Sequence, residues 1–142
     1  MNSAFRIWAS LVSLAIIVQV GLAAYGAFNA IDKSDDNGTI GKDAVSGGFD
    51  AHALLGYAIV GGAIVLIVLA VATRRAMPSR LRWSGLILGL LVVQVILAGA
   101  GDAVPVIGIL HGMNALAIAG FAGSLAGREW AAFRGAARSA VP

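Results

Sequence analysis

The residues of this chain best suited to metal chemistry are its only two histidines, His52 and His111. Imidazole is the commonest metal ligand in proteins, and two imidazoles can supply both axial ligands of one haem iron. Iron held in this way keeps no open coordination position, so it suits electron transfer better than catalysis on a bound substrate. We therefore expect His52 and His111 to be metal ligands.

The two histidines occupy matching places in an internal repeat. A shift of 59 positions pairs identical residues: His52 with His111, Ile59 with Ile118, Gly61 with Gly120, and Ala63 with Ala122. A shift of 75 aligns Gln19 with Gln94, each between two valines. The repeat predicts two tandem helix pairs related by an axis along the membrane normal, with the histidines on neighbouring parallel helices.

Small residues surround each histidine, as a flat macrocycle between helices would require. These are Ala53 and Gly56 near the first, and Gly112 and Ala115 near the second. We expect Gly56, Gly112 and Ala115 to contact the cofactor. Small residues at four-residue spacing also pack helices together, and the column that continues to Gly123 and Gly127 predicts a contact with another helix.

The other polar residues within the apolar stretches that could take part in such chemistry are Gln19, Gln94 and Asn114. The two glutamines are expected to form hydrogen bonds across the bundle, or to orient groups near the cofactor. The chain has no cysteine, so thiolate metal sites and iron-sulfur clusters are excluded. With no carboxylate pair, no nucleophile beside a base and no phosphate-binding loop, the sequence predicts no catalytic residue.

The composition places the chain among membrane proteins. Hydrophobic residues make up 59% of it and charged residues only 12%. A net charge of +3 would suggest nucleic acid in a soluble protein, but no basic face interleaved with aromatic residues is present. We therefore expect a lipid bilayer as its surroundings and no nucleic-acid partner.

Four charge-free stretches are long enough to cross a bilayer, at about 20 residues per helix. They are residues 7–31, 51–73, 83–101 and 103–127. Since only Arg6 precedes the first stretch and no good cleavage site follows it, we expect a retained span. His111 lies closer to Arg128 than His52 does to Arg74, so the last helix is expected to continue toward Phe133. The prediction is a single all-α domain, 1–142, a transmembrane four-helix bundle.

Charge predicts the orientation of the spans, because Lys and Arg near helix ends favour the cytoplasmic side. In a model with four spans, all eight arginines fall on one side, and the six aspartates and two lysines on the other. We therefore expect a bacterial plasma-membrane protein with cytoplasmic N- and C-termini. The long 32–50 loop and both histidines would then lie near the outer surface.

The acidic stretch from Asp32 to Gly38 has a composition that calcium loops share. It lacks the closing Glu and the fixed glycine of an EF-hand, so a solvated loop is favoured over a calcium site.

One family resemblance rests on the run Val93-Gln94-Val95-Ile96-Leu97-Ala98-Gly99, followed by Pro105 and then Leu110-His111. Over nearly its whole length, the chain resembles one half of the eight-helix haem A synthase family, and also short four-helix bacterial membrane proteins. The resemblance implies a four-helix haem-binding unit with His52 and His111 as the ligand pair. Family halves carry an acidic or amide residue and an arginine where this chain has Phe49 and Ala53.

Three hypotheses follow from the sequence. The leading one is a b-type cytochrome that binds one haem b between His52 and His111, for electron transfer or redox sensing. The second is a cofactor-free accessory or assembly subunit of a larger membrane complex. The third is an enzyme like haem A synthase, acting as a homodimer of four-helix halves. An electron-transfer or accessory role is favoured over catalysis.

Overall fold

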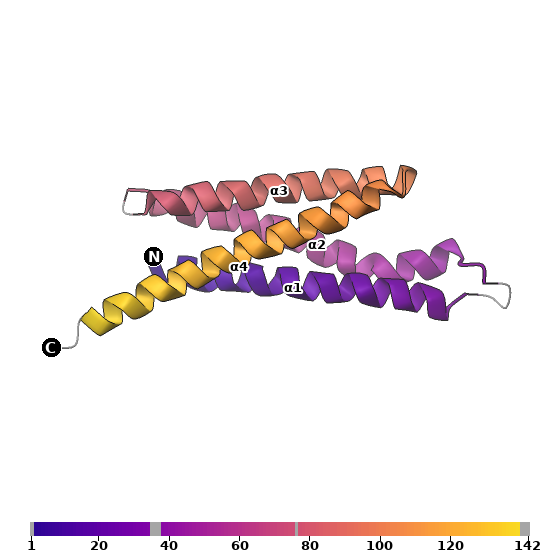
Figure 1. The fold of residues 1–142 in the computed structure, drawn as a ribbon, viewed down its shortest axis with the longest axis horizontal. Coiled ribbons are helices and arrows are strands. Elements are labelled where there is room, and N and C mark those ends of the chain that lie inside the picture. Colours follow the sequence, from indigo (N-terminus) through magenta and orange to yellow (C-terminus); the bar gives the residue numbers. More distant parts are fainter. Residues whose placement is uncertain (1, 35–37, 76, 140–142) are drawn as a thin grey trace.

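Four long α-helices form the structure, a computed structural model that describes residues 2–34, 38–75 and 77–139 (Figure 1). The helices are α1 (Asn2–Asp32), α2 (Lys42–Ala72), α3 (Pro78–Ala103) and α4 (Ile107–Ser139). Within the described residues, all four are long and apolar enough to cross a membrane. The predicted all-α fold of four membrane-length helices is confirmed.

Local sequence explains where these helices begin and end. Pro78 occupies the start of α3, where its fixed φ suits a helix and its missing N–H is not needed. Asp43 lies in the first turn of α2, near the positive end of the helix dipole. Val104 is extended because Pro105 follows it, and this stops α3 before α4 begins.

Two helices are longer than the apolar stretches that predicted them. The segment 32–50 was predicted to be a loop, but α2 begins at Lys42, so much of that segment is helical. The early start is stabilised by packing against α1, where a Cβ added at Gly48 would lie 2.8 Å from the carbonyl oxygen of Gly26. Helix α4 ends at Ser139, so the prediction that it continues toward Phe133 is confirmed.

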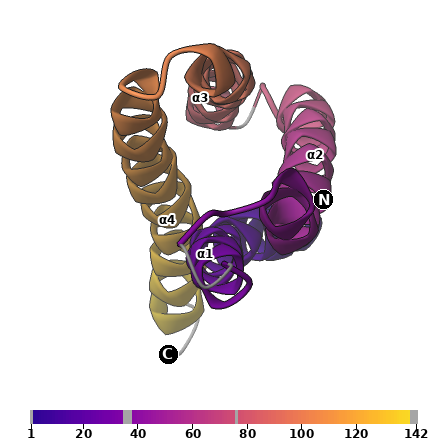
Figure 2. The same ribbon diagram turned by 90° about the vertical axis from the view of Figure 1, so that its right-hand side faces the viewer.

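The helices are arranged as a ring in which each contacts its two neighbours (Figure 2). Helices α1 and α2 form one close pair and α3 and α4 the other, while α1 also contacts α4, and α2 contacts α3. The described residues of α2 and α4 make no close backbone contact. The expectation that the histidine-bearing helices are neighbours was therefore wrong, because α2 and α4 lie diagonally across the bundle.

The buried core repeats with the same two shifts as the sequence. Buried residues of the first pair have buried counterparts in the second: Val12 with Ile87, Ile16 with Leu91, Ile59 with Ile118, Ala63 with Ala122, and Leu66 with Leu125. Each pair thus presents the same apolar face to the other. The predicted construction from two tandem helix pairs is confirmed.

One end of the bundle, which we call the arginine end, contains the start of α1, the end of α2, the start of α3 and the end of α4 (Figure 1). All eight arginines belong to it, while the described aspartates and both lysines belong to the opposite end, which we call the histidine end. The segregation of charge expected from the sequence is therefore present in the fold.

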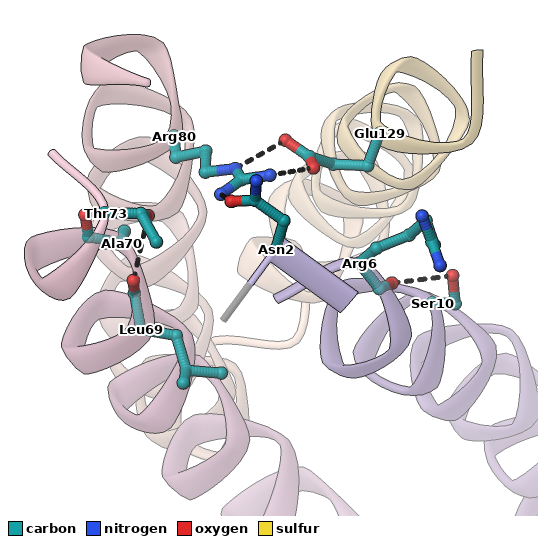
Figure 3. Close-up of polar contacts among 8 residues, drawn as sticks. All are labelled: Asn2, Arg6, Ser10, Leu69, Ala70, Thr73, Arg80 and Glu129. Carbon is teal, nitrogen blue, oxygen red and sulfur yellow. Dashed lines mark hydrogen bonds and ion pairs between the residues drawn. The ribbon is translucent and has the colours of Figure 1, made fainter. Parts of the chain in front are cut away.

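A buried ion pair closes the arginine end (Figure 3). Arg80 of α3 is only 3% exposed and donates two hydrogen bonds to Glu129 of α4, at 2.8 Å from Nε and 2.5 Å from Nη2. Its Nη1 donates to Oδ1 of Asn2 on α1 at 2.9 Å, and its guanidinium lies 4.6 Å from the centre of the Phe5 ring. Three helices are therefore joined through one guanidinium.

Candidate functional site

A cavity of about 620 Å³ lies between the four helices in the half of the bundle nearer the histidine end. This volume is within the range of about 300–1,000 Å³ that small-molecule and cofactor sites occupy. His52 of α2 and His111 of α4 both line it, although their helices lie diagonally apart. Their ring centroids are 6.5 Å apart, with the ring planes inclined at 54°.

His52 is held to α1 by a reciprocal pair of hydrogen bonds with Gln19. The Gln19 side chain donates from Nε2 to the His52 carbonyl oxygen at 2.7 Å. In return, His52 Nδ1 lies 3.1 Å from the Gln19 carbonyl oxygen. Because a carbonyl only accepts hydrogen bonds, this contact assigns the ring proton to Nδ1 and leaves the lone pair on Nε2. We call this arrangement a glutamine clamp.

The second glutamine clamp repeats the first between α3 and α4. Gln94 donates from Nε2 to the His111 carbonyl oxygen at 3.0 Å, and His111 Nδ1 lies 3.2 Å from the Gln94 carbonyl oxygen. Both imidazoles therefore have the same tautomer, with Nε2 left to accept a proton or a metal. A metal-bound histidine commonly has its other nitrogen fixed in this way. The expectation that both glutamines form interhelical hydrogen bonds is confirmed.

The small residues predicted to contact a cofactor all line the cavity: Gly56, Gly112 and Ala115, together with Ala53. A Cβ added at Gly112 would meet nothing within 4 Å, so this glycine leaves open space beside His111. A Cβ added at Gly56 would lie 3.1 Å from Gln19 Nε2. Gly56 therefore also makes room for the first glutamine clamp.

Phe49 and Ala53 both lie beside His52 on α2. The Phe49 ring meets the His52 ring edge-on, with centroids 6.1 Å apart. It also covers Gly26 of α1, where an added Cβ would lie 2.8 Å from the Phe49 ring. An apolar contact thus supports the ring of His52, while Ala53 lines the cavity without adding charge.

The described residues around the cavity include few charged side chains and few side chains that could bind a metal. Among the described residues that line it, Asp102 is the only one with a charged side chain, and it is exposed. The described residues contain no group of three or more His, Cys, Asp or Glu side chains that could hold a metal ion. A metal bound by the two imidazoles would therefore need further ligands of its own, as a macrocycle provides.

Sequence reasoning missed two functional features of the structure. Asp102 was placed in a connection but belongs to the end of α3, and its position one helical turn after Ala98 could have revealed that it faces the cavity. Arg80 was counted only among the eight arginines that predict the topology, although the shift of 75 pairs it with Phe5, which is fully buried. The acidic residues Asp35 and Asp36, part of the stretch compared with a calcium loop, lie outside the described residues.

Comparison with protein-family models, curated proteins and solved structures found no match for this chain. The resemblance to half of a haem A synthase therefore stays a prediction.

Proposed function

We propose that this chain is a b-type cytochrome of the membrane, in which His52 and His111 bind the iron of one haem. The proposal rests mainly on the distance between the two rings. If two imidazole nitrogens bind one metal from opposite sides at about 2 Å, and each ring centre lies about 1.2 Å further out, the two centroids lie about 6.4 Å apart. The separation between His52 and His111 is 6.5 Å.

The tautomers of the two rings support the same assignment. Each Nδ1 has a backbone carbonyl as its partner, so the nitrogen with the free lone pair is Nε2 on both rings. Neither imidazole has to change its tautomer or lose a hydrogen bond to bind iron. Both imidazoles could therefore bind the iron of a haem without rearranging their contacts with the glutamines.

The mostly apolar lining of the cavity also supports this assignment. Small residues line the cavity beside both histidines, and their short side chains leave the space open: Ala53, Gly56, Gly112 and Ala115. A bound haem would supply a one-electron Fe(III)/Fe(II) couple. The glutamine clamps fix both imidazoles, and Asp102 at the cavity wall would disfavour placing the haem carboxylates beside it.

The proposal includes an orientation in the membrane. We place the arginine end and both termini at the cytoplasmic side, because basic residues near spans favour that side. The haem would then lie nearer the outer surface, where it could exchange electrons with a donor or acceptor on that side.

An absorption spectrum of the detergent-purified protein tests the haem assignment. Protein from haem-supplemented cells should show the sharp reduced bands of a six-coordinate b-type haem, at about one haem per chain. His52→Ala and His111→Ala should each convert the spectrum to high spin or abolish it. Tyr57→Phe is the matched control, since Tyr57 also lines the cavity but carries no nitrogen ligand.

Two results would contradict the cytochrome proposal. One is a colourless protein that takes up no haem on reconstitution, which would favour the accessory-subunit hypothesis. The other is a haem spectrum that persists when both histidines are replaced, because the iron would then be bound elsewhere.

A further inference from the structure

The two glutamine clamps differ in the partner of the amide oxygen. Gln94 Oε1 accepts a hydrogen bond from Asn114 Nδ2 at 2.6 Å, and the same Nδ2 donates to the Leu90 carbonyl oxygen at 2.9 Å. Gln19 Oε1 is buried and has no hydrogen-bond partner in the described part of the chain. The shift of 59 pairs Asn114 with Leu55, which has no polar side-chain atom.

This difference changes how firmly each amide is held. The terminal torsion of a glutamine has a broad energy profile, so its orientation depends on hydrogen bonds at both ends of the amide. In Gln94 both ends are engaged, and Nε2 stays directed at the His111 carbonyl oxygen. In Gln19 only Nε2 is engaged.

His52 has a different support that His111 lacks. The Phe49 ring contacts the His52 ring edge-on, and the shift of 59 pairs Phe49 with Gly108, which has no side chain. One histidine is thus supported by an aromatic contact and the other by an extended amide network. The two histidines are related by the repeat but are positioned by different residues.

We propose that Asn114 is a positioning residue that acts through Gln94 on His111, and not on His52. The hydrogen bonds of the Asn114 side chain go to Gln94 and to the Leu90 carbonyl oxygen, and Gln94 in turn donates to the His111 carbonyl oxygen. The effect of Asn114 on iron binding rests on the proposed haem-binding function. Its effect on the position of His111 rests on the hydrogen bonds alone.

Nitrogen NMR tests the part of the inference that needs no haem. The chain has only two histidines, so a protein labelled with ¹⁵N-histidine gives signals from two imidazoles, assigned with His52→Ala and His111→Ala. Asn114→Leu should speed hydrogen exchange of the His111 Nδ1–H severalfold and leave that of His52 unchanged.

The converse variant uses the partner position in the repeat. Leu55→Asn places an amide donor where Gln19 Oε1 lacks one, so it should slow exchange of the His52 Nδ1–H and leave His111 unchanged. This variant adds a hydrogen bond instead of removing one, and it keeps the test usable if Asn114→Leu folds poorly. Equal effects on both imidazoles, or none on either, would overturn the proposal.

Transfer of haem to an apo-globin tests the part that concerns iron. In the His52→Ala background, where His111 would be the remaining ligand, Asn114→Leu should speed haem loss severalfold. In the His111→Ala background it should change the rate little. A similar acceleration in both backgrounds would mean that Asn114 serves general packing, and would overturn its assignment to His111.

The NMR and haem-transfer measurements can distinguish a failure of the positioning role of Asn114 from a failure of the cytochrome proposal. Selective NMR effects in a protein that binds no haem would uphold the positioning role and reject the cytochrome. Normal haem binding with unselective effects would uphold the cytochrome and reject the role of Asn114.

Discussion

At the scale of single residues, backbone carbonyl groups matter as much as the histidine side chains. The sequence singled out five polar residues of the spans but not how they pair: His52, His111, Gln19, Gln94 and Asn114. Each glutamine clamp forms only if two helices pack in one particular register, and that register cannot be read from the sequence. The same reason explains why the missing partner of Gln19 Oε1 became visible only in the structure.

Asp102 should lower the reduction potential of a haem in the cavity. Asp102 lines the cavity, and a negative charge near a haem stabilises ferric over ferrous iron. Asp102→Asn should therefore raise the midpoint potential, by an amount on the order of tens of millivolts. Potentiometric titration measures the change, and Asp43→Asn, which alters an exposed carboxylate outside the cavity lining, should leave the potential nearly unchanged.

Gly112 should act as a space-making residue for the cofactor. Since an added Cβ there would meet nothing within 4 Å, Gly112→Leu should fold but fill part of the cavity. We expect the haem content per chain to fall severalfold while the melting temperature of the haem-free protein changes little. Gly120→Leu is the control, because Gly120 has the same open surroundings but does not line the cavity. Equal haem content in the two variants would contradict this role.

At the scale of helices, hydropathy and charge predicted the four spans but not their full extent. Residues 42–50 carry glycines and charges, which hydropathy assigns to a loop, yet the packing of Gly48 on Gly26 makes them helical. The contact predicted for the glycine column of α4 is present at Gly123, where an added Cβ would lie 3.9 Å from Ser13 Oγ of α1. At Gly127 an added Cβ would meet no described atom of this chain within 4 Å, so a helix contact there stays a prediction for an oligomer.

Removing one partner of the Arg80–Glu129 ion pair should destabilise the fold more than removing both. Removing one partner of a buried pair leaves an unpaired charge and destabilises by about 3–5 kcal/mol. Glu129→Leu should therefore lower the detergent melting temperature clearly, whereas Arg82→Met, at an exposed arginine of α3, should not.

The double variant Arg80→Phe with Glu129→Leu completes this test. It replaces the pair with apolar groups, and Phe is the residue that the repeat itself places at the position matching Arg80, namely Phe5. The double variant should recover much of the stability lost in Glu129→Leu. A double variant less stable than either single variant would show that the pair contributes more than charge compensation.

At the scale of the whole molecule, the repeat explains why residues on diagonal helices meet. A residue near the axis that relates the two helix pairs faces its own counterpart across that axis. His52 meets His111 in this way at the histidine end, and Phe5 meets Arg80 at the arginine end. The sequence could therefore predict that the histidines converge, although it could not reveal which helices are neighbours. That arrangement depends on how the two pairs pack, which is set by the shared apolar face.

The segregation of charge between the two ends leads to a prediction about topology. If the arginine end is cytoplasmic, a cysteine at Ser79 should be protected from an impermeant thiol reagent in intact cells, and a cysteine at Ser34 should be labelled. The chain has no native cysteine, so each single variant reports one position only.

Permeabilised cells provide the control for this labelling, because both cysteines should then react. Ser79 is exposed just after the start of α3, and Ser34 follows α1, so neither is expected to be hidden by the protein fold. The opposite pattern in intact cells would invert the molecule. It would place both histidines near the cytoplasm, and a haem bound between them would then exchange electrons with cytoplasmic partners instead of outer ones.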